Sequence, residues 1–303
     1  MLATVTMSAT ALRARCRVAV IGDVHGAWDS RDLEALRLLA PDVVLAVGDF
    51  DNEEPAIVRS VADACDAAIL GNHDAWRSVR NGRVSAELRA SVEALGGRDA
   101  GFNRLELRPD DGRALAVVGG RPLSFGGSSV TPGAWKLLSA LYGVASLEES
   151  RDCLTDLLLR DPSGDTIVLA HSGPSGLGAT ASSICGRDFK RPALDFGDDD
   201  LRDALETAAA CGARVPLVVF GHMHAELMLG GRRTMVVRRA GTVFVNAAEV
   251  PRHRADGTAH FTLVELEDGE VREVAGLWVG AEGIAQREVL YAANALEPDP
   301  SPT

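Results

Sequence analysis

Short apolar runs alternate with segments that carry helix signals through the first hundred residues. The runs at 17–21, 43–47 and 67–70 have the length of strands that are buried on both faces. Segments with helix-start or helix-stop residues separate and follow these runs, at 29–40, 53–64 and 84–95. This order predicts β-α-β-α-β-α, which forms a parallel sheet with crossover helices.

The second half of the chain is richer in strands. A hairpin is predicted around the Asp110-Asp111-Gly112 turn, and helices at 147–159 and 201–210 each lead to an apolar run. The strands predicted in this half lie at 104–107, 114–119, 166–170, 216–220, 225–229, 234–239, 242–246, 259–266 and 271–279. Because strands gather late in the chain, we expect a second sheet packed face to face on the first, with helices outside both.

The composition fits one large α/β domain. The chain has 303 residues, of which 46% are apolar, and no linker or internal repeat divides it. We predict one domain at 17–292, preceded by a flexible segment at 1–16 and followed by a Pro-rich disordered tail at 293–303. No apolar run approaches the length of a membrane-spanning helix, so no membrane partner is predicted.

Net charge narrows the range of partners. A formal net charge of −12 argues against a surface that coats nucleic acid. It does not exclude a small phosphorylated substrate, because a metal site supplies its own local positive charge. Nothing in the sequence indicates the oligomeric state.

Cysteine usage and the N-terminal residues bear on the compartment. The five cysteines are scattered without a Cys-x-x-Cys pair, which indicates reduced thiols and a cytoplasmic protein. Residues 1–17 lack the apolar core of a secretory signal. If they are instead the remnant of a transit peptide, the chloroplast stroma is the alternative.

Side chains of metal-ligand type follow five of the predicted strands. They are Asp23 and His25, Asp49, Asn72 and His73, His171, and His222 and His224. Any one of these strand ends is ordinary turn chemistry. In open α/β sheets, however, ligands bind at the carboxyl ends of the strands. Five such ends in one chain therefore predict a single site at that edge.

The chemistry of these side chains indicates a metal centre. Asp, Asn and His without Cys suit a divalent transition metal such as Mn²⁺, Fe or Zn²⁺. Seven candidate ligands, the set above without His73, are too many for one ion, and they fit two ions that share one carboxylate. Two metals about 3.5–4 Å apart are the usual arrangement for cleaving phosphoesters.

The motifs resemble those of the calcineurin-like metallophosphoesterases. They run in family order as Asp23-x-His25, Gly48-Asp49, Gly71-Asn72-His73-Asp74, His171 and Gly221-His222-x-His224. The resemblance implies a four-layer αββα sandwich, with two central mixed sheets flanked by helices. It also implies the ligands: Asp23, His25 and His224 for one ion, Asn72, His171 and His222 for the other, and Asp49 as the bridge. His73 would lie beside the ions and stabilise or protonate the leaving oxygen.

Departures from the better-known branches of the family matter as well. Asp51-Asn52-Glu53 stands where the phosphoprotein phosphatases carry a longer block with an arginine for the phosphate. Phe50 and Asp51 follow the bridging residue, so the tyrosine ligand of purple acid phosphatases is missing. The blocks around Trp28 and Trp76 are similar to a branch known from cyanobacteria and plastid-bearing organisms.

The function that this set of residues predicts is hydrolysis of a small phosphomonoester or phosphodiester by metal-bound hydroxide. One alternative is a metal-binding scaffold of the same fold without turnover. Another is a metal-dependent nuclease, which the acidic balance of the chain disfavours.

For several residues near these motifs, two interpretations remain open. Asp74 caps the next segment or orients His73, and Asn52 bonds His73 or stabilises its own loop. Arg187, Lys190 and Arg191 reach a substrate phosphate or lie in a solvated loop. Trp28, Trp76 and Trp135 wall a pocket or pack in the core.

Overall fold

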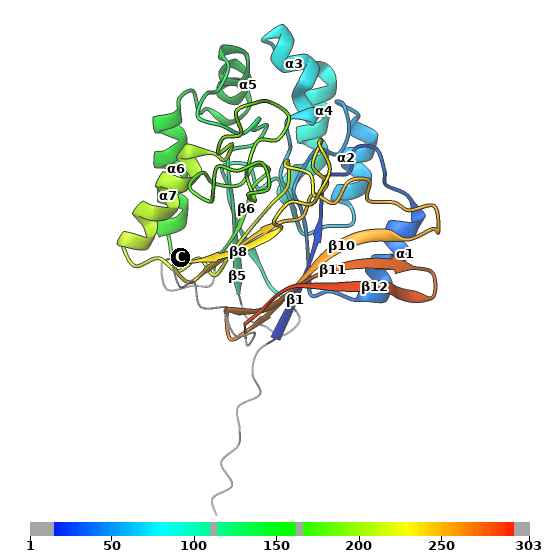
Figure 1. Cartoon of the computed structure of the whole chain (residues 1–303). Coiled ribbons are helices and arrows are strands. Elements are labelled where there is room, and N and C mark those ends of the chain that lie inside the picture. Colours follow the sequence, from blue (N-terminus) through cyan, green and yellow to red (C-terminus); the bar gives the residue numbers. More distant parts are fainter. Residues whose placement is uncertain (1–14, 110–113, 162–165, 294–303) are drawn as a thin grey trace, which may run out of the picture.

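Two six-stranded sheets packed face to face form the centre of the molecule, and helices cover their outer faces (Figure 1). The computed structural model describes residues 15–109, 114–161 and 166–293. Both sheets contain parallel and antiparallel pairs. The predicted αββα sandwich with two central mixed sheets is therefore confirmed. The predicted terminal segments lie almost wholly outside the described residues, so the domain boundaries stay predictions.

The first sheet has the strand order β12-β11-β10-β1-β2-β3. Its strands are β1 (Arg15–Ile21), β2 (Val43–Ala46), β3 (Ala67–Ala68), β10 (Ala259–Glu267), β11 (Glu270–Gly280) and β12 (Gly283–Ala292). The first three run parallel, as predicted, and β10 pairs antiparallel with the other edge of β1.

The expectation that the late strands build the second sheet is wrong for β10 and β11. These strands extend the first sheet. β2 pairs with only one edge of β1, and β10 pairs with the other edge from Thr262 to Glu267. β12 was not predicted at all. Most of its side chains are exposed, and its polar centre, Gln286-Arg287-Glu288, hides the strand signal.

The second sheet has the order β4-β5-β6-β7-β9-β8. Its strands are β4 (Arg104–Leu107), β5 (Leu115–Gly119), β6 (Thr166–Leu169), β7 (Leu217–Phe220), β8 (Val236–Arg239) and β9 (Thr242–Asn246). β4 and β5 pair antiparallel as the predicted hairpin, whose turn at 110–112 lies outside the described residues. The strand predicted at 225–229 is absent from this described segment, since Gly230 and Gly231 turn the chain back with positive φ.

Three apolar clusters separate the four layers. Successive side chains of β1 point to opposite faces of the sheet. Val18 and Val20 belong to the cluster between the two sheets, while Ala19 and Ile21 belong to the cluster between the first sheet and its helices. A third cluster lies between the second sheet and its own helices. Strands buried on both faces, as the apolar runs predicted, follow from this layering.

Helices cover both outer faces. The helices are α1 (Ser30–Leu39), α2 (Pro55–Ala62), α3 (Trp76–Asn81), α4 (Ala86–Leu95), α5 (Pro132–Tyr142), α6 (Leu147–Leu159) and α7 (Asp199–Ala210). Residues of α6 and α7 pack on the second sheet, and those of α1, α2, α4 and α5 on the first. Two short 3-10 turns, His73–Ala75 and Gly96–Arg98, complete the described helices. The sequence did not predict α3 or α5, although Thr131 caps α5 by accepting from the amide of Ala134.

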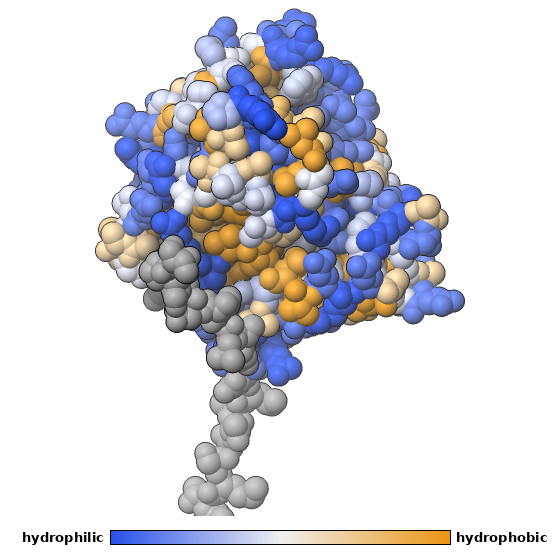
Figure 2. Space-filling model, in the orientation of Figure 1, coloured by the Kyte–Doolittle hydropathy of each residue, from blue (hydrophilic) through white to orange (hydrophobic). Residues whose placement is uncertain are grey.

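The surface carries few long apolar stretches. Among the described residues, no helix is both long and apolar enough to cross a membrane. Hydrophilic residues dominate the outline of the face drawn in Figure 2, while hydrophobic residues gather near its middle, where Figure 1 places β6 and β8. Smaller hydrophobic spots lie elsewhere on the same face (Figure 2).

A buried ion network ties the segment after β5 to α6 and α7. Arg121, whose side chain is 2% exposed, donates to Asp200 at 2.8 Å and to Asp198 at 2.6 Å. The hydroxyls of Ser124 and Ser150 donate to the same two carboxylates. Because Asp198 immediately precedes α7, the network anchors the end of the long 172–198 loop.

Replacing Arg121 with methionine is expected to lower the free energy of unfolding by about 3–5 kcal/mol, because two buried carboxylates lose their cation. Urea denaturation followed by circular dichroism measures this loss. Arg151, which pairs with Asp152 at the surface, is the matched control, and its replacement should leave the free energy of unfolding nearly unchanged, because solvent screens a surface pair. Equal losses in the two variants would contradict the structural role of the network.

Candidate metal centre

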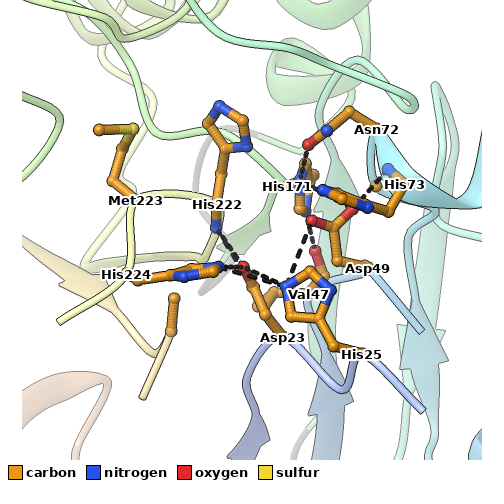
Figure 3. A network of polar contacts seen from close by, with 12 residues as sticks. Asp23, His25, Val47, Asp49, Asn72, His73, His171, His222, Met223 and His224 are labelled. Carbon is orange, nitrogen blue, oxygen red and sulfur yellow. Dashed lines mark hydrogen bonds and ion pairs between the residues drawn. The ribbon is translucent and has the colours of Figure 1, made fainter. Parts of the chain in front are cut away.

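The carboxyl ends of five strands meet at one place between the two sheets. Asp23, Asp49 and Asn72 follow β1, β2 and β3 of the first sheet, while His171 and His222 follow β6 and β7 of the second. Figure 3 shows these residues gathered with His25, His73 and His224 in one network. The structure thus brings together every residue that the sequence predicted for the site.

Asp49 lies between two groups of donors. One group contains Asp23, His25 and His224, and the other contains Asp49, His171 and His222; within each group the ligand atoms lie within 4.8 Å of one another. Asp49 Oδ2 is 3.8 Å from His25 Nε2, and Asp49 Oδ1 is 3.4 Å from His171 Nε2. One oxygen of this carboxylate therefore faces each group. His73 also forms such a group with His25 and Asp49.

Unusual backbone angles aim three of these side chains. His25, Asp49 and His222 have φ values of 46°, 50° and 70°, in the left-handed region that non-glycine residues rarely adopt. On a regular strand His222 and His224 would point to opposite faces. The positive φ of His222 is the turn that re-aims the pair, as the sequence required.

Two glycines allow the backbone to approach the carboxylates. A Cβ atom on Gly71 would lie 2.3 Å from Asp49 Oδ1, and one on Gly221 would lie 2.1 Å from Asp23 Oδ1. Both distances are shorter than any real contact. The glycines that precede Asn72 and His222 are therefore required by the packing of the site itself.

The orientation of the donors fits bound cations. His171 Nδ1 donates to the carbonyl of Val47 at 2.8 Å, which leaves the lone pair on Nε2. That atom lies 2.9 Å from Asn72 Oδ1, and His25 Nε2 lies 3.2 Å from His224 Nε2. Facing lone pairs repel unless a proton or a cation lies between them. The residues present therefore fit a metal centre on their own geometry.

Burial keeps His25 and His222 in the neutral form that binds metals. Burial lowers the pKa of His25 to about 4 and that of His222 to about 3, so both rings are neutral at neutral pH. Burial also opposes the charged form of His224, but the hydrogen bond to Asp23 raises the pKa of that ring above its usual value. The ring of His222 holds its Nε2 3.1 Å from the carbonyl of Phe125, and a proton donated there leaves Nδ1 as the ligand atom.

The pKa values of the Asp23 and Asp49 carboxylates are shifted in opposite directions. Burial alone would raise the pKa of Asp23, but the hydrogen bond from His224 and the nearby histidine charges hold it well below its usual range. Burial, together with repulsion from Asp23, raises the pKa of Asp49 well above its usual range. Opposite shifts at neighbouring carboxylates are typical of a functional site.

His73 stands at the edge of the centre. Its backbone amide donates to Asp49 Oδ1 at 2.8 Å, and its ring Nδ1 lies 3.2 Å from Asn52 Oδ1. The ring stacks on Trp76 with centroids 5.6 Å apart. Burial lowers its pKa. With Nδ1 held by Asn52, the other ring nitrogen remains available to a substrate.

Asp74 has neither of the two roles that its sequence position indicated. Its carboxylate accepts from the amides of Phe50, Asp51 and Gly71, so it joins the loop after β2 to the loop after β3. Burial raises its pKa to about 7 although these bonds lower it. Asp74 therefore positions the segments that carry Asp49 and Asn72.

Other candidates lie away from the centre. Arg187 donates to the carbonyl of Pro192, and none of Arg187, Lys190 and Arg191 lines the cavity beside the metal ligands. Trp28 and Trp135 pack in the core under the helices, and only Trp76 adjoins the site. The sequence did not indicate Arg233, whose buried guanidinium donates to the carbonyl of His224 at 2.9 Å. A lone arginine in a loop carries no signal of this role.

The layered α/β fold gathers Asp, Asn and His side chains at the carboxyl ends of both sheets, in groups that could hold metal ions. A family model described as calcineurin-like phosphoesterase matches residues 16–226, which is more than half of the chain. The chain belongs to the calcineurin-like phosphoesterase family. The narrower resemblance to one branch of that family stays a prediction.

One solved structure supports the fold, and two others show a weaker likeness. One crystal structure superposes with a TM-score of 0.53 at 11% identity, covering 92% of this chain and 100% of its own. A metallophosphoesterase from Sphaerobacter thermophilus gives 0.34 at 16% identity, covering 88% of both chains. Purple acid phosphatase PPD1 from yellow lupin gives 0.42 at 13% identity, over 92% of this chain and 54% of the lupin chain. The last two scores are too low to support a conclusion about function. No curated protein sequence matches this chain.

Proposed function

We propose that the protein is a dinuclear metal-dependent phosphoesterase that hydrolyses a small phosphomonoester or phosphodiester. The position of Asp49 carries this proposal, because its two oxygens face two separate donor groups. A carboxylate in that position suits a bridge between two cations of the kind that phosphoester hydrolysis requires. Mn²⁺, Fe and Zn²⁺ are the metals that the Asp, Asn and His donors favour.

The ligands divide between the two cations. Asp23, His25 and His224 would hold one, Asn72, His171 and His222 the other, and Asp49 would bridge them. When bound, the pair supplies Lewis acidity for the phosphoryl oxygens and lowers the pKa of an attacking water. The buried bond from His171 to Val47 and the bond from His222 to Phe125 fix the ring tautomers for this task.

His73 would act on the leaving group. In the reaction the ester P–O bond breaks, phosphorus takes the oxygen of water, and the leaving alcohol takes a proton. His73 lines the cavity beside Asp49, and Asn52 fixes the orientation of its ring. Its imidazolium form can place the proton on the departing oxygen. Asp74 keeps the two loops in register while this happens.

The alternatives receive less support from the described residues. A scaffold without turnover has no need of His73, yet His73 lies at the cavity with its ring oriented. A nuclease requires a basic track for the nucleic acid backbone. None of the described residues that line the cavity is a lysine or an arginine. The cytoplasmic location stays a prediction from composition.

Metal removal and return test the proposal. Protein stripped with a chelator should release no phosphate from a panel of phosphomonoesters and diesters. Addition of Mn²⁺, Fe²⁺ or Zn²⁺ should restore turnover of at least one ester class, measured as phosphate or alcohol release. Metal uptake without any turnover on the whole panel would instead support the scaffold. Cleavage of single-stranded DNA in preference to small esters would support the nuclease.

A further inference from the structure

Exposed aromatic and apolar side chains stand at the mouth of the candidate metal centre. A cavity of about 200 Å³ lies beside Asp49 and His73, and Phe189 and Met228 also line it. Phe189 is 50% exposed and Met228 is 72% exposed. Trp76 does not line this cavity itself, but it stacks on His73, which does, and it is 41% exposed. Apolar side chains in a soluble protein are rarely left uncovered together unless they bind something.

Two strings of rings hold these aromatics in fixed positions. Trp76 lies between His73 at 5.6 Å and Phe125 at 5.8 Å, measured between ring centroids. Phe189 packs on Phe196 at 5.2 Å, and Phe196 stacks on His222 with an interplanar angle of 17°. Each exposed ring is thus connected to a histidine of the site, Trp76 by direct stacking and Phe189 through its edge-to-face contact with Phe196. Flat surfaces held in this way suit a flat ligand better than a flexible chain.

The charges around the cavity indicate that the ligand carries no negative group besides the phosphate ester. None of the described residues that line it is a lysine or an arginine, whereas Asp188 and Glu226 are acidic. The nearby guanidinium of Arg233 is already used, since it pairs with Asp188 at 3.2 Å and donates to three loop carbonyls. A second phosphate or a carboxylate on the substrate would therefore find no cationic side chain among the described lining residues, and it would face the carboxylate of Glu226.

We propose that the substrate carries a single phosphate ester whose leaving group is a flat, uncharged aromatic moiety. Trp76 and Phe189 are then the residues that determine specificity, and Met228 supplies an adaptable apolar contact. This inference rests on the proposed phosphoesterase function and adds the substrate class. A departing group that receives its proton from His73 leaves next to the indole of Trp76.

Paired substrates separate ring shape from leaving-group chemistry. Benzyl phosphate and cyclohexylmethyl phosphate are similar in size and both leave as primary alkoxides, but only the first has a flat ring. The methyl phosphodiesters of the same two alcohols are tested as well, so that the comparison can be made whether the protein hydrolyses monoesters or diesters. We expect kcat/KM to be about three- to tenfold higher for the benzyl ester, the range that aromatic stacking provides. A 4-carboxybenzyl ester should react at least about threefold more slowly than the benzyl ester.

Variants assign the preference to the two rings. Trp76→Ala and Phe189→Ala should each bring the benzyl to cyclohexylmethyl ratio of kcat/KM toward one. The ratio is the proper readout, because any displacement of His73 slows both esters alike. Leu194→Ala is the matched control for Phe189→Ala, since Leu194 is 47% exposed in the same 172–198 loop but does not line the cavity and has no ring. It should leave the ratio unchanged.

The possible outcomes are distinct. Equal rates on both parent esters, or a ratio that neither Trp76→Ala nor Phe189→Ala moves, would overturn the aromatic leaving group. A faster cyclohexylmethyl ester would overturn it in favour of an aliphatic substrate. A metal-loaded parent that hydrolyses no ester at all contradicts the proposed function, and this inference falls with it.

Discussion

Replacing Asp49 with asparagine is expected to lower kcat/KM by at least about 10²-fold, a typical loss when one charged group of a catalytic centre is removed. The substitution keeps the size of the side chain but removes the negative charge between the two donor groups. The amide nitrogen would also face one of the groups in place of an oxygen. Both cations would then be held less tightly, and the attacking water would lose its placement.

Metal content checks the cause of this loss. Inductively coupled plasma mass spectrometry on purified protein should find about two metal ions per parent chain and fewer in Asp49→Asn. Asp99 is the matched control, because its carboxylate is also largely buried but binds Gly101 and Tyr142 away from the site. Asp99→Asn should keep both the metal content and the rate. Equal rates in Asp49→Asn and the parent would remove the basis for a shared carboxylate.

The position of the candidate metal ligands was predictable because each follows a strand that the sequence specifies locally. An apolar run, a glycine and a ligand-type residue stand together in the sequence, and parallel strands bring their carboxyl ends to one edge. This is why Asp49 after β2 and His171 after β6 were placed without a structure. Gly71 and Gly221 could be read in the same way, although their contacts with Asp49 and Asp23 could not.

Long-range pairing was not predictable in the same way. The sequence of β10 predicts a strand. It does not indicate that the strand pairs with β1, which lies more than two hundred residues earlier in the chain. The role of Asp74 was hidden for a similar reason. Its three donors come from two loops that are separated in sequence, at 50–51 and at 71. Local propensity favoured a cap, and the tertiary contacts decided otherwise.

The aromatic mouth of the cavity shows a further limit. Phe189 and Met228 lie in segments without regular secondary structure, so no periodicity indicates which way their side chains point. Trp76 could be singled out by residue type but not distinguished from Trp28 and Trp135. Only the stacking of Trp76 on His73, compared with the core packing of the other two, separates a recognition residue from a structural one.

Replacing His73 with alanine is expected to lower kcat by about 10²–10⁴-fold for esters of alkyl alcohols, the range for loss of a general acid. Alkoxides leave slowly without a proton, so the chemical step depends on the missing imidazole. For p-nitrophenyl esters the loss should be much smaller, because p-nitrophenolate leaves without protonation. Steady-state rates on the two substrate classes, measured with the same metal, give this comparison.

Metal content again separates two roles, because His73 also stands within ligand distance of His25 and Asp49. If His73 donates a proton, His73→Ala keeps the metal content of the parent and the loss depends on the leaving group. If His73 is a ligand, the metal content falls and both substrate classes slow equally. Asn52→Ala is the intermediate control, since it frees the ring of His73 without removing it. The loss of kcat in Asn52→Ala should be smaller than in His73→Ala but should again be larger for alkyl esters than for p-nitrophenyl esters. A poorly oriented general acid still matters most where the leaving group needs a proton.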